Sequence, residues 1–496
     1  MTSSIAPPIA SMLLMAMLAT LAGCKGPAAD DGPVTVSAIG DTPELRDANR
    51  AALSPADRIL AAATAQGLVT FDENGQISPA LAERWTVSDD GLSYLFRLRE
   101  DAAWPDGDRI TTSDIARRLR AVLAARSTNP LKDLLAVVDE IVAVTPEVIE
   151  IRLAAPRPHL LDLLAQPQLG MVRDKAGSGP MRIERREARA LLLAPYADPP
   201  MSEAPDPEEA IARTVWLRGE TASRAVARYR LGAAELVTGG TIADLPVARA
   251  AEMPTAQLRL DNARGLFAFA FTGRQPFLED AGVRAALSMA VDRERMVRAF
   301  GLTGWRPAVA IVPDGLADLP QPSQPGWSTL STAQRRAMAR DIIAQWATSQ
   351  GPAPLLRIAM PRGSGMRSIL ARLRADWARI GIAVARVGPD ETADLTLVDQ
   401  VAPADTASWY LRNFSCARTI ACSQEAESSL ILARDAPNVD ERVAKLVEAD
   451  ALMAEANPAI ILAAPLRWAL VSPRLTGWHE NGRGVHPLDR LREARR

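Results

Sequence analysis

Few side chains in this chain have the types and spacing that acid–base or metal chemistry requires. The 496 residues include three histidines and three cysteines. His159 follows a proline, and His479 and His486 lie near the C-terminus with no cysteine beside them. Because a protein metal site needs several such ligands close together, we expect neither a metal site nor a bound cofactor. We interpret the histidines as surface residues.

The sequence also lacks the common catalytic and nucleotide-binding motifs. It contains no G-x-S-x-G nucleophile turn, no G-x-x-x-x-G-K-[S/T] phosphate loop and no G-x-G-x-x-G dinucleotide fingerprint. Lysine and arginine number 57 against 59 aspartates and glutamates, which gives a formal net charge of −2. Nucleic-acid binding requires a strong excess of positive charge. We therefore expect a protein that is not an enzyme and that binds no nucleic acid.

The N-terminal residues indicate export and lipid attachment. Ser11–Ala22 is an apolar run shorter than the roughly 20 residues that span a bilayer, which is typical of a signal peptide. It ends in Leu21-Ala22-Gly23-Cys24, which resembles the lipobox in which a bacterial cysteine is acylated. We predict a signal peptide over 1–23, lipidation of Cys24 and a linker over 24–32. The alternative is a short buried helix with a chance cysteine.

Cys416 and Cys422 are the remaining cysteines and lie six positions apart. Export would place them in an oxidising compartment, where a local disulfide that closes a small loop is favoured. Two free, buried thiols remain the alternative. A metal site is not expected there because no further soft ligand lies nearby in the sequence.

The spacing of apolar residues predicts the elements that must position these groups. Patterns typical of strands are found at 34–39, 92–98, 148–153 and 266–271. Patterns typical of helices are found at 53–68 and 283–297. Thr111 followed by Asp114 is typical of a capping box that begins a helix. The run 355–398 has the pattern of a strand, a helix and two further strands. This alternation predicts an α/β fold, and the chain is long enough for more than one lobe.

One region of the chain resembles a known family. Residues 67–122 are similar to the signature region of the extracellular solute-binding proteins of the peptide/nickel type, which serve ABC importers. The pieces that agree in order and spacing are Gly67-Leu68, Phe71–Gly75, Leu81–Trp85, Ser88–Leu92, Phe96–Arg99, Trp104–Gly107 and Thr112–Asp114. Further agreement is found at 177–180, 276–293, 380–384 and 476–478. The resemblance covers most of the chain after Cys24.

The resemblance implies a two-lobed α/β flytrap fold, the periplasmic-binding-protein fold, with an extra subdomain inserted in the first lobe. The first lobe would comprise 33–70, 170–264 and 472–496, the extra subdomain 71–169, and the second lobe 265–471. A ligand would lie in the cleft and favour the closed state through contacts with both lobes. An extended peptide would be held largely through its main chain, as in strand addition.

The resemblance also suggests residues that contact the ligand. In peptide-binding members, an aspartate of the second lobe pairs with the terminal ammonium of the ligand, and the corresponding segment here is 399–422. Aspartates would receive the ammonium, an arginine would pair with a carboxylate, and aromatic rings would form a wall. The candidates are Asp399, Asp405, Trp409, Tyr410, Arg412, Phe267 and Phe269. The alternative is that the aromatic residues are core and the aspartates cap loops.

The function implied by the resemblance is that of a monomeric, lipid-anchored binding protein in the periplasm, attached to the inner or the outer membrane. It would capture peptides and deliver them to the permease and ATPase complex of an ABC importer. One alternative is a ligand-binding or sensor lipoprotein that works without a transporter. Others are a binder of a non-peptide solute, such as a metal chelate or an opine, and an enzyme on the same scaffold.

Overall fold

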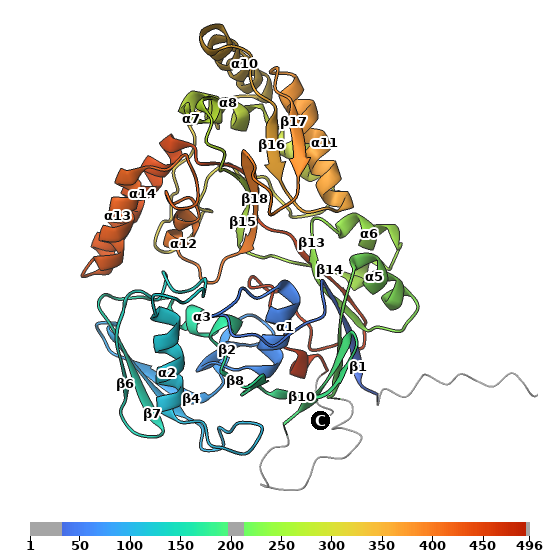
Figure 1. Ribbon diagram of the computed structural model, residues 1–496, viewed down its shortest axis with the longest axis vertical. Helices are drawn as coiled ribbons and strands as arrows, with labels where there is room; N and C mark the ends of the chain where they lie inside the picture. The colour runs from blue at the N-terminus through green and yellow to red at the C-terminus, as the bar shows by residue number, and fades with distance from the viewer. Residues whose placement is uncertain (1–31, 197–212, 493–496) are drawn as a thin grey trace, which may run out of the picture.

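The computed structural model describes residues 32–196 and 213–492. The predicted signal peptide, Cys24 and the linker up to residue 31 lie outside these ranges. Among the helices that the two ranges contain, none is both long enough and apolar enough to cross a membrane. The described chain has a mixed α/β architecture, as the sequence pattern predicts (Figure 1). It is built on three larger sheets.

A seven-stranded sheet forms the centre of the first lobe. Its strand order is β10-β11-β12-β1-β13-β20-β14, and β1 pairs in parallel with β12 and β13. The strands are β1 (Val34–Ile39), β10 (Met181–Glu187), β11 (Ala190–Pro195), β12 (Val215–Glu220), β13 (Leu236–Thr241), β14 (Leu258–Asp261) and β20 (Arg467–Val471). Leu236 packs in one cluster with α1 (Pro55–Thr64), and Val237 packs in another with α5 (Ala222–Arg230) and α6 (Leu245–Ala250). Helices therefore cover both faces of this sheet.

The extra subdomain contains a four-stranded antiparallel sheet of order β4-β5-β7-β6. Its elements and those that flank it are β2 (Val69–Phe71), β3 (Ile77–Pro79), β4 (Ala82–Val87), β5 (Ser93–Leu98), α2 (Thr112–Leu123), β6 (Val138–Ala143), β7 (Val148–Leu153), α3 (Leu160–Leu164), β8 (Val172–Arg173) and β9 (Ala176–Gly177). The predicted capping box is confirmed. The Thr111 side chain accepts from the backbone N–H of Asp114, and the Asp114 carboxylate accepts from that of Thr111.

A five-stranded sheet of order β17-β16-β18-β15-β19 forms the second lobe. Its strands are β15 (Gly265–Phe271), β16 (Leu356–Ala359), β17 (Val384–Val387), β18 (Leu395–Val401) and β19 (Ala459–Ala463). Its helices are α7 (Pro276–Glu279), α8 (Ala281–Ala290), α9 (Arg293–Arg298), α10 (Thr332–Gln350), α11 (Ser364–Ala378), α12 (Ala407–Arg412), α13 (Gln424–Asp435) and α14 (Val439–Ala456). The pattern predicted over 355–398 is confirmed.

The chain returns to the first lobe earlier than the resemblance implies. Strand β19 pairs with β15 in the five-stranded sheet, whereas β20 pairs with β13 and β14 in the seven-stranded sheet. Residues 467–471, which were assigned to the second lobe, are thus held by backbone hydrogen bonds to the first. We place this lobe boundary between β19 and β20 and keep the other boundaries as proposed.

Candidate functional site

Asp399, a candidate for binding a ligand ammonium, is paired with an arginine of the protein itself. Arg467 Nη1 donates to the Asp399 carboxylate at 2.7 Å, and Arg467 Nη2 donates to the Asp399 carbonyl oxygen at 3.2 Å. The two side chains are only 15% and 18% exposed. Asp399 lies on β18 and Arg467 begins β20, so the pair joins the two large sheets. A ligand ammonium would have to displace this arginine.

Asp405 is paired in the same way, with two arginines. Arg264 Nη1 donates to it at 3.0 Å and Arg483 Nη1 at 3.3 Å. Arg483 Nη2 also donates to Asp162 of the extra subdomain at 2.9 Å, and its guanidinium lies 5.7 Å from the centre of the Phe71 ring. In this arrangement both candidate aspartates are therefore already paired with arginines of the chain.

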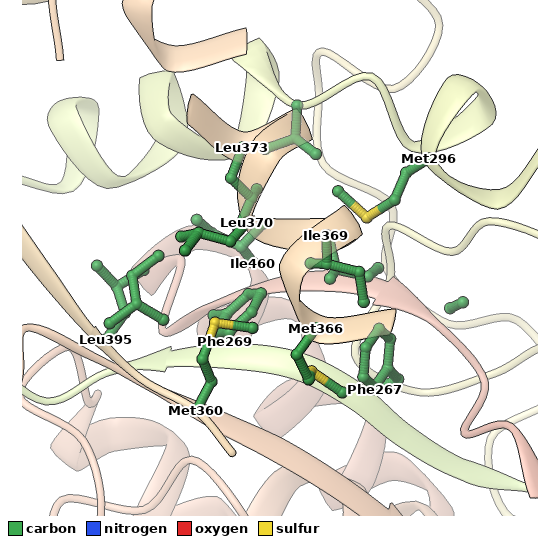
Figure 2. Close-up of a cluster of buried hydrophobic side chains, with 14 of the residues drawn as sticks. Phe267, Phe269, Met296, Met360, Met366, Ile369, Leu370, Leu373, Leu395 and Ile460 are labelled. Carbon is green, nitrogen blue, oxygen red and sulfur yellow. The ribbon is translucent and has the colours of Figure 1, made fainter. Parts of the chain in front are cut away.

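Phe267 and Phe269 are core residues, which corrects their assignment as ligand contacts. Both side chains are fully buried and pack with Met366 and other residues of α11, as Figure 2 shows. Leu266, on the other face of β15, packs in a separate cluster with α12 and α14. Since both faces of β15 are covered, its aromatic side chains are enclosed in the core.

Trp409 and Tyr410 also belong to the core rather than to a ligand wall. They lie on α12 and contact each other edge to face, with ring centroids 4.9 Å apart. Tyr410 is fully buried and Trp409 is 9% exposed. Burial raises the pKa of the Tyr410 hydroxyl, which keeps it neutral. These two residues anchor α12 in the core and are not among the residues that line the cavity beside Arg412.

Arg412, at the end of α12, is the predicted contact residue that lines a cavity. The cavity has a volume of about 40 Å³ and lies between the extra subdomain and the second lobe. Its walls include Asp133, Arg157 and His159 from the subdomain, together with Ser408, Arg412, Arg434 and Arg442 from the second lobe. A water position needs about 10–15 Å³, so the cavity could hold a group of a few heavy atoms.

Four arginines and one aspartate, Asp133, line the cavity. Burial lowers the pKa of Arg157 to about 10, and the positive charges of Arg442 and Arg412 add to this shift. Burial also lowers the pKa of Arg412; Asp133 opposes that shift, and Arg434 and Arg442 add to it. All four side chains remain charged near neutral pH, so mutual repulsion is present when the cavity holds no anion.

Sequence reasoning missed Arg157, Arg434 and Arg442. They are three among 57 lysines and arginines, and no motif separates them from the rest. Arg157 and Arg434 are 277 positions apart, and the fold brings them together so that Arg157 Nη2 donates to the Arg434 carbonyl oxygen. The only local signal is the break Pro156-Arg157-Pro158 at the end of a strand.

Cys416 and Cys422 are joined by a disulfide in the structure, with their Cα atoms 4.9 Å apart. The bridge closes the loop between α12 and α13, and the Cys416 N–H donates to Glu427 of α13 at 2.9 Å. It thereby constrains the segment that follows Arg412. In the described ranges, no group of three or more histidine, cysteine, aspartate or glutamate side chains is arranged to hold a metal ion.

Comparisons with known proteins agree with this architecture. The family model for bacterial extracellular solute-binding proteins, family 5 (middle), matches residues 76–415. The periplasmic murein peptide-binding protein MppA of Escherichia coli K12 is 23% identical over 352 residues, which is 64% of this chain and 62% of MppA. The periplasmic oligopeptide-binding protein OppA of the same organism is 25% identical over 312 residues, 56% of each chain. The matched regions thus span less than two thirds of these relatives.

Solved structures are similar over nearly the whole chain. The Escherichia coli murein tripeptide binding protein MppA superposes with a TM-score of 0.78, at 20% identity, over 93% of this chain and 98% of that one. Haemophilus influenzae OppA in complex with the peptide RPPGFSPFR superposes with a TM-score of 0.78, at 17% identity, over 92% of this chain and 98% of that one. Campylobacter jejuni NikZ in complex with Ni(L-His) superposes with a TM-score of 0.73, at 19% identity, over 92% of this chain and 97% of that one. The fold is therefore the two-lobed fold of these binding proteins.

Proposed function

The chain belongs to the bacterial extracellular solute-binding proteins, family 5, and from this premise we propose that it captures a small solute between its lobes for an ABC importer. The solute would be released unchanged to the permease and ATPase complex. The protein would act as a monomer in the periplasm. A solute that contacts both lobes binds the closed state more tightly than the open state. This difference in affinity shifts the protein toward the closed state, which a permease could then recognise.

The observation that carries this proposal is that Arg483 joins three parts of the chain: the first lobe, the extra subdomain and the second lobe. Arg483, in the C-terminal part of the first lobe, pairs with Asp162 of the extra subdomain and with Asp405 of the second lobe, at 2.9 Å and 3.3 Å. The cavity is lined by Leu163 and Thr406, the residues next to these two aspartates. A solute held there would touch the extra subdomain and the second lobe at once.

Peptides are the solute class that we propose first. Relatives of the chain carry the names of peptide-binding proteins, and an extended peptide can be held through its main chain with little dependence on its side chains. Because Asp399 and Asp405 are paired with arginines, a peptide would be oriented by its carboxylate at Arg412 rather than by its ammonium.

A second candidate is a non-peptide solute. The complex of NikZ with Ni(L-His) on the same fold supports a metal chelate, and an opine is a further alternative. A sensor that works without a transporter would use the same cleft. A permease and ATPase gene pair beside this gene favours the importer, and its absence favours the sensor.

Lipid attachment at Cys24 is a further part of the proposal and rests on the sequence Leu21-Ala22-Gly23-Cys24. Cells fed a labelled fatty acid should incorporate the label into the wild-type protein and not into Cys24→Ser. Incorporation into both proteins, or into neither, would argue against an anchor at this cysteine.

Native mass spectrometry tests the proposed function. The full-length protein is expressed in its exported form in rich medium, purified in mild detergent and weighed under native and denaturing conditions. We expect an additional noncovalent mass that is lost on denaturation, and tandem analysis identifies it. Absence of any bound mass, together with no thermal shift across a panel of peptides, chelates and opines, would refute the proposal. Chemical cleavage of a bound compound would indicate an enzyme instead.

A further inference from the structure

The cavity between the extra subdomain and the second lobe has more positive charge than its own partners neutralise. Two of its arginines have carboxylate partners. Arg434 donates to Asp435 through Nε and Nη2, at 2.7 Å and 2.8 Å. Arg442 lies 3.5 Å from Asp318 and donates to the Ser408 hydroxyl at 3.0 Å. These two pairs are therefore already balanced.

The other two arginines lack such partners. Arg157 donates to the carbonyl oxygens of Pro156 and Arg434, which carry no full charge. Arg412 forms no hydrogen bond or ion pair through its guanidinium with any residue in 32–196 or 213–492, although its side chain is partly buried at the cavity wall. A partly buried cation that contacts no anion directly is less stable than a paired one, so an anion that reaches Arg412 would be favoured.

Among the described residues, the carboxylates around the cavity form no ion pair with Arg412. Asp133 lines the cavity and its charge raises the pKa of Arg412, but Asp133 is exposed and forms no ion pair within the described ranges. Glu427 accepts the Cys416 N–H, and Asp318 accepts the Thr406 hydroxyl at 2.7 Å and the Ala407 N–H at 3.0 Å. The Ser408 hydroxyl accepts from Arg442 and keeps its own proton free to donate.

We infer that this cavity binds a compact oxyanion group of the solute, either a phosphate or a pair of carboxylates, with Arg412 as its direct partner. The inference rests on the proposed function and narrows its solute class to acidic solutes. Guanidinium groups match the geometry of phosphate and carboxylate oxygens, and the cavity volume of about 40 Å³ suits such a group rather than a whole peptide. Arg157 and the Ser408 hydroxyl complete the set of donors.

Isothermal titration of the full-length protein with inorganic phosphate and with succinate tests the inference, with sodium chloride at equal ionic strength as the reference. We expect saturable binding of at least one of the two anions. In Arg412→Gln we expect the Kd for that anion to rise by about tenfold or more, which corresponds to about 1.4 kcal/mol. Binding of phosphate alone assigns a phosphoryl group, and binding of succinate alone assigns paired carboxylates; either result supports the inference.

The matched control is Arg189→Gln, because Arg189 is an exposed arginine on the turn between β10 and β11. It should bind the anion as the wild type does. Ser408→Ala provides a second test that keeps all four arginines and should weaken binding by a smaller factor. Urea unfolding of each variant shows whether it is folded. An unchanged Kd in folded Arg412→Gln, or no anion binding by the wild type, overturns the inference.

Native mass spectrometry of the same samples separates this inference from the proposed function. If Arg412→Gln binds the solute recovered from the wild type with an unchanged Kd, the anion site is wrong and the solute-binding function stands. If inorganic phosphate or succinate binds at Arg412, but no solute is retained and no peptide, chelate or opine of the panel gives a thermal shift, the anion site stands and the proposed function fails.

Discussion

Glu220 shows how one residue couples stability to pH in this protein. It lies at the end of β12, is 7% exposed, and accepts hydrogen bonds from Ser37 Oγ at 2.5 Å and from Arg228 Nε at 2.9 Å. Burial raises the pKa of this carboxyl, but the hydrogen bonds from Arg228 and Ser37 outweigh burial, so the net pKa is below its ordinary value of 4.5. A carboxyl with a lowered pKa stabilises the folded state above its unfolded pKa.

We therefore expect the free energy of unfolding to fall as the pH drops below 4.5, through the lowered pKa of Glu220. At pH 7, the free energy of unfolding of Glu220→Gln should be about 1.5–3 kcal/mol lower than that of the wild type, the range for hydrogen bonds to charged groups. Between pH 7 and pH 3.5, the free energy of unfolding should fall less in Glu220→Gln than in the wild type. Urea unfolding at pH 7, 5.5, 4.5 and 3.5 measures both effects. Glu184→Gln, at an exposed position of the same sheet, is the control. Parallel pH profiles for wild type and Glu220→Gln would contradict the assignment.

At the residue scale, the sequence-based prediction named one residue that lines the cavity, Arg412, and also named residues that the fold buries or pairs elsewhere. Arg412 lies at the cavity, where its type and position suggested a ligand contact. Asp399 and Asp405 could not be recognised as paired residues, because Arg467 and Arg483 reach them only through the fold. Local sequence carries no signal for such distant partners.

At the scale of elements, the start of α11 contacts the first lobe through a glycine. The Gly365 N–H donates to the Ala243 carbonyl oxygen at 2.9 Å. A Cβ atom at position 365 would lie 1.8 Å from the carbonyl oxygen of Ile242. Only glycine permits this approach, which brings α11 of the second lobe against the segment before α6 of the first.

Gly365→Ala should lower the free energy of unfolding by about 1–3 kcal/mol, the range for overpacking in a well-packed region. Alanine gains up to about 1 kcal/mol in helix propensity, which is less than the expected steric cost. Urea unfolding measures the change. Gly326→Ala is the control, because a Cβ atom there meets nothing within 4 Å. Equal stability of Gly365→Ala and Gly326→Ala would show that the lobes are not in contact at this point.

The elements were predicted best where local signals suffice. The capping box at Thr111 and Asp114 is one such signal. The predicted single helix over 283–297 is instead two helices, since Val291 is extended and the Asp292 side chain accepts from the Arg295 N–H to begin α9. Asp292 is a residue type that often begins a helix, and it was the local signal for a second helix. The apolar spacing continues across Val291 and Asp292 and therefore predicted one helix instead.

At the scale of the whole molecule, Arg483 joins the three parts of the chain through its pairs with Asp162 and Asp405. Each hydrogen bond to a charged group contributes about 1.5–3 kcal/mol, so Arg483→Gln should raise the fraction of open molecules by about tenfold or more. Small-angle X-ray scattering should then give a larger radius of gyration for the variant than for the wild type.

The control for this prediction is Arg152→Gln. Arg152 also pairs with two carboxylates, Glu140 at 2.7 Å and Glu150 at 2.8 Å, but both lie within the four-stranded sheet of the extra subdomain. Its scattering should match that of the wild type. If Arg483→Gln scatters like Arg152→Gln, the pairs of Arg483 do not hold the parts together.

The division into lobes was available from the resemblance but not from the spacing of residues. Alternating strands and helices predict an α/β fold without showing which strands share a sheet. Strand β20 illustrates the limit: its sequence fits either sheet, and only its pairing with β13 and β14 assigns it to the first lobe.

Hydrogen exchange with and without solute tests the central claim, that one solute is held between two parts of the molecule, most directly. The solute recovered from the purified protein is added back to solute-free protein, and exchange is followed by mass spectrometry. We predict slower exchange both in residues 157–164 of the extra subdomain and in residues 405–414 of the second lobe, and a return to the original rates after dialysis. Protection confined to one of these segments, or absent from both, would contradict the claim.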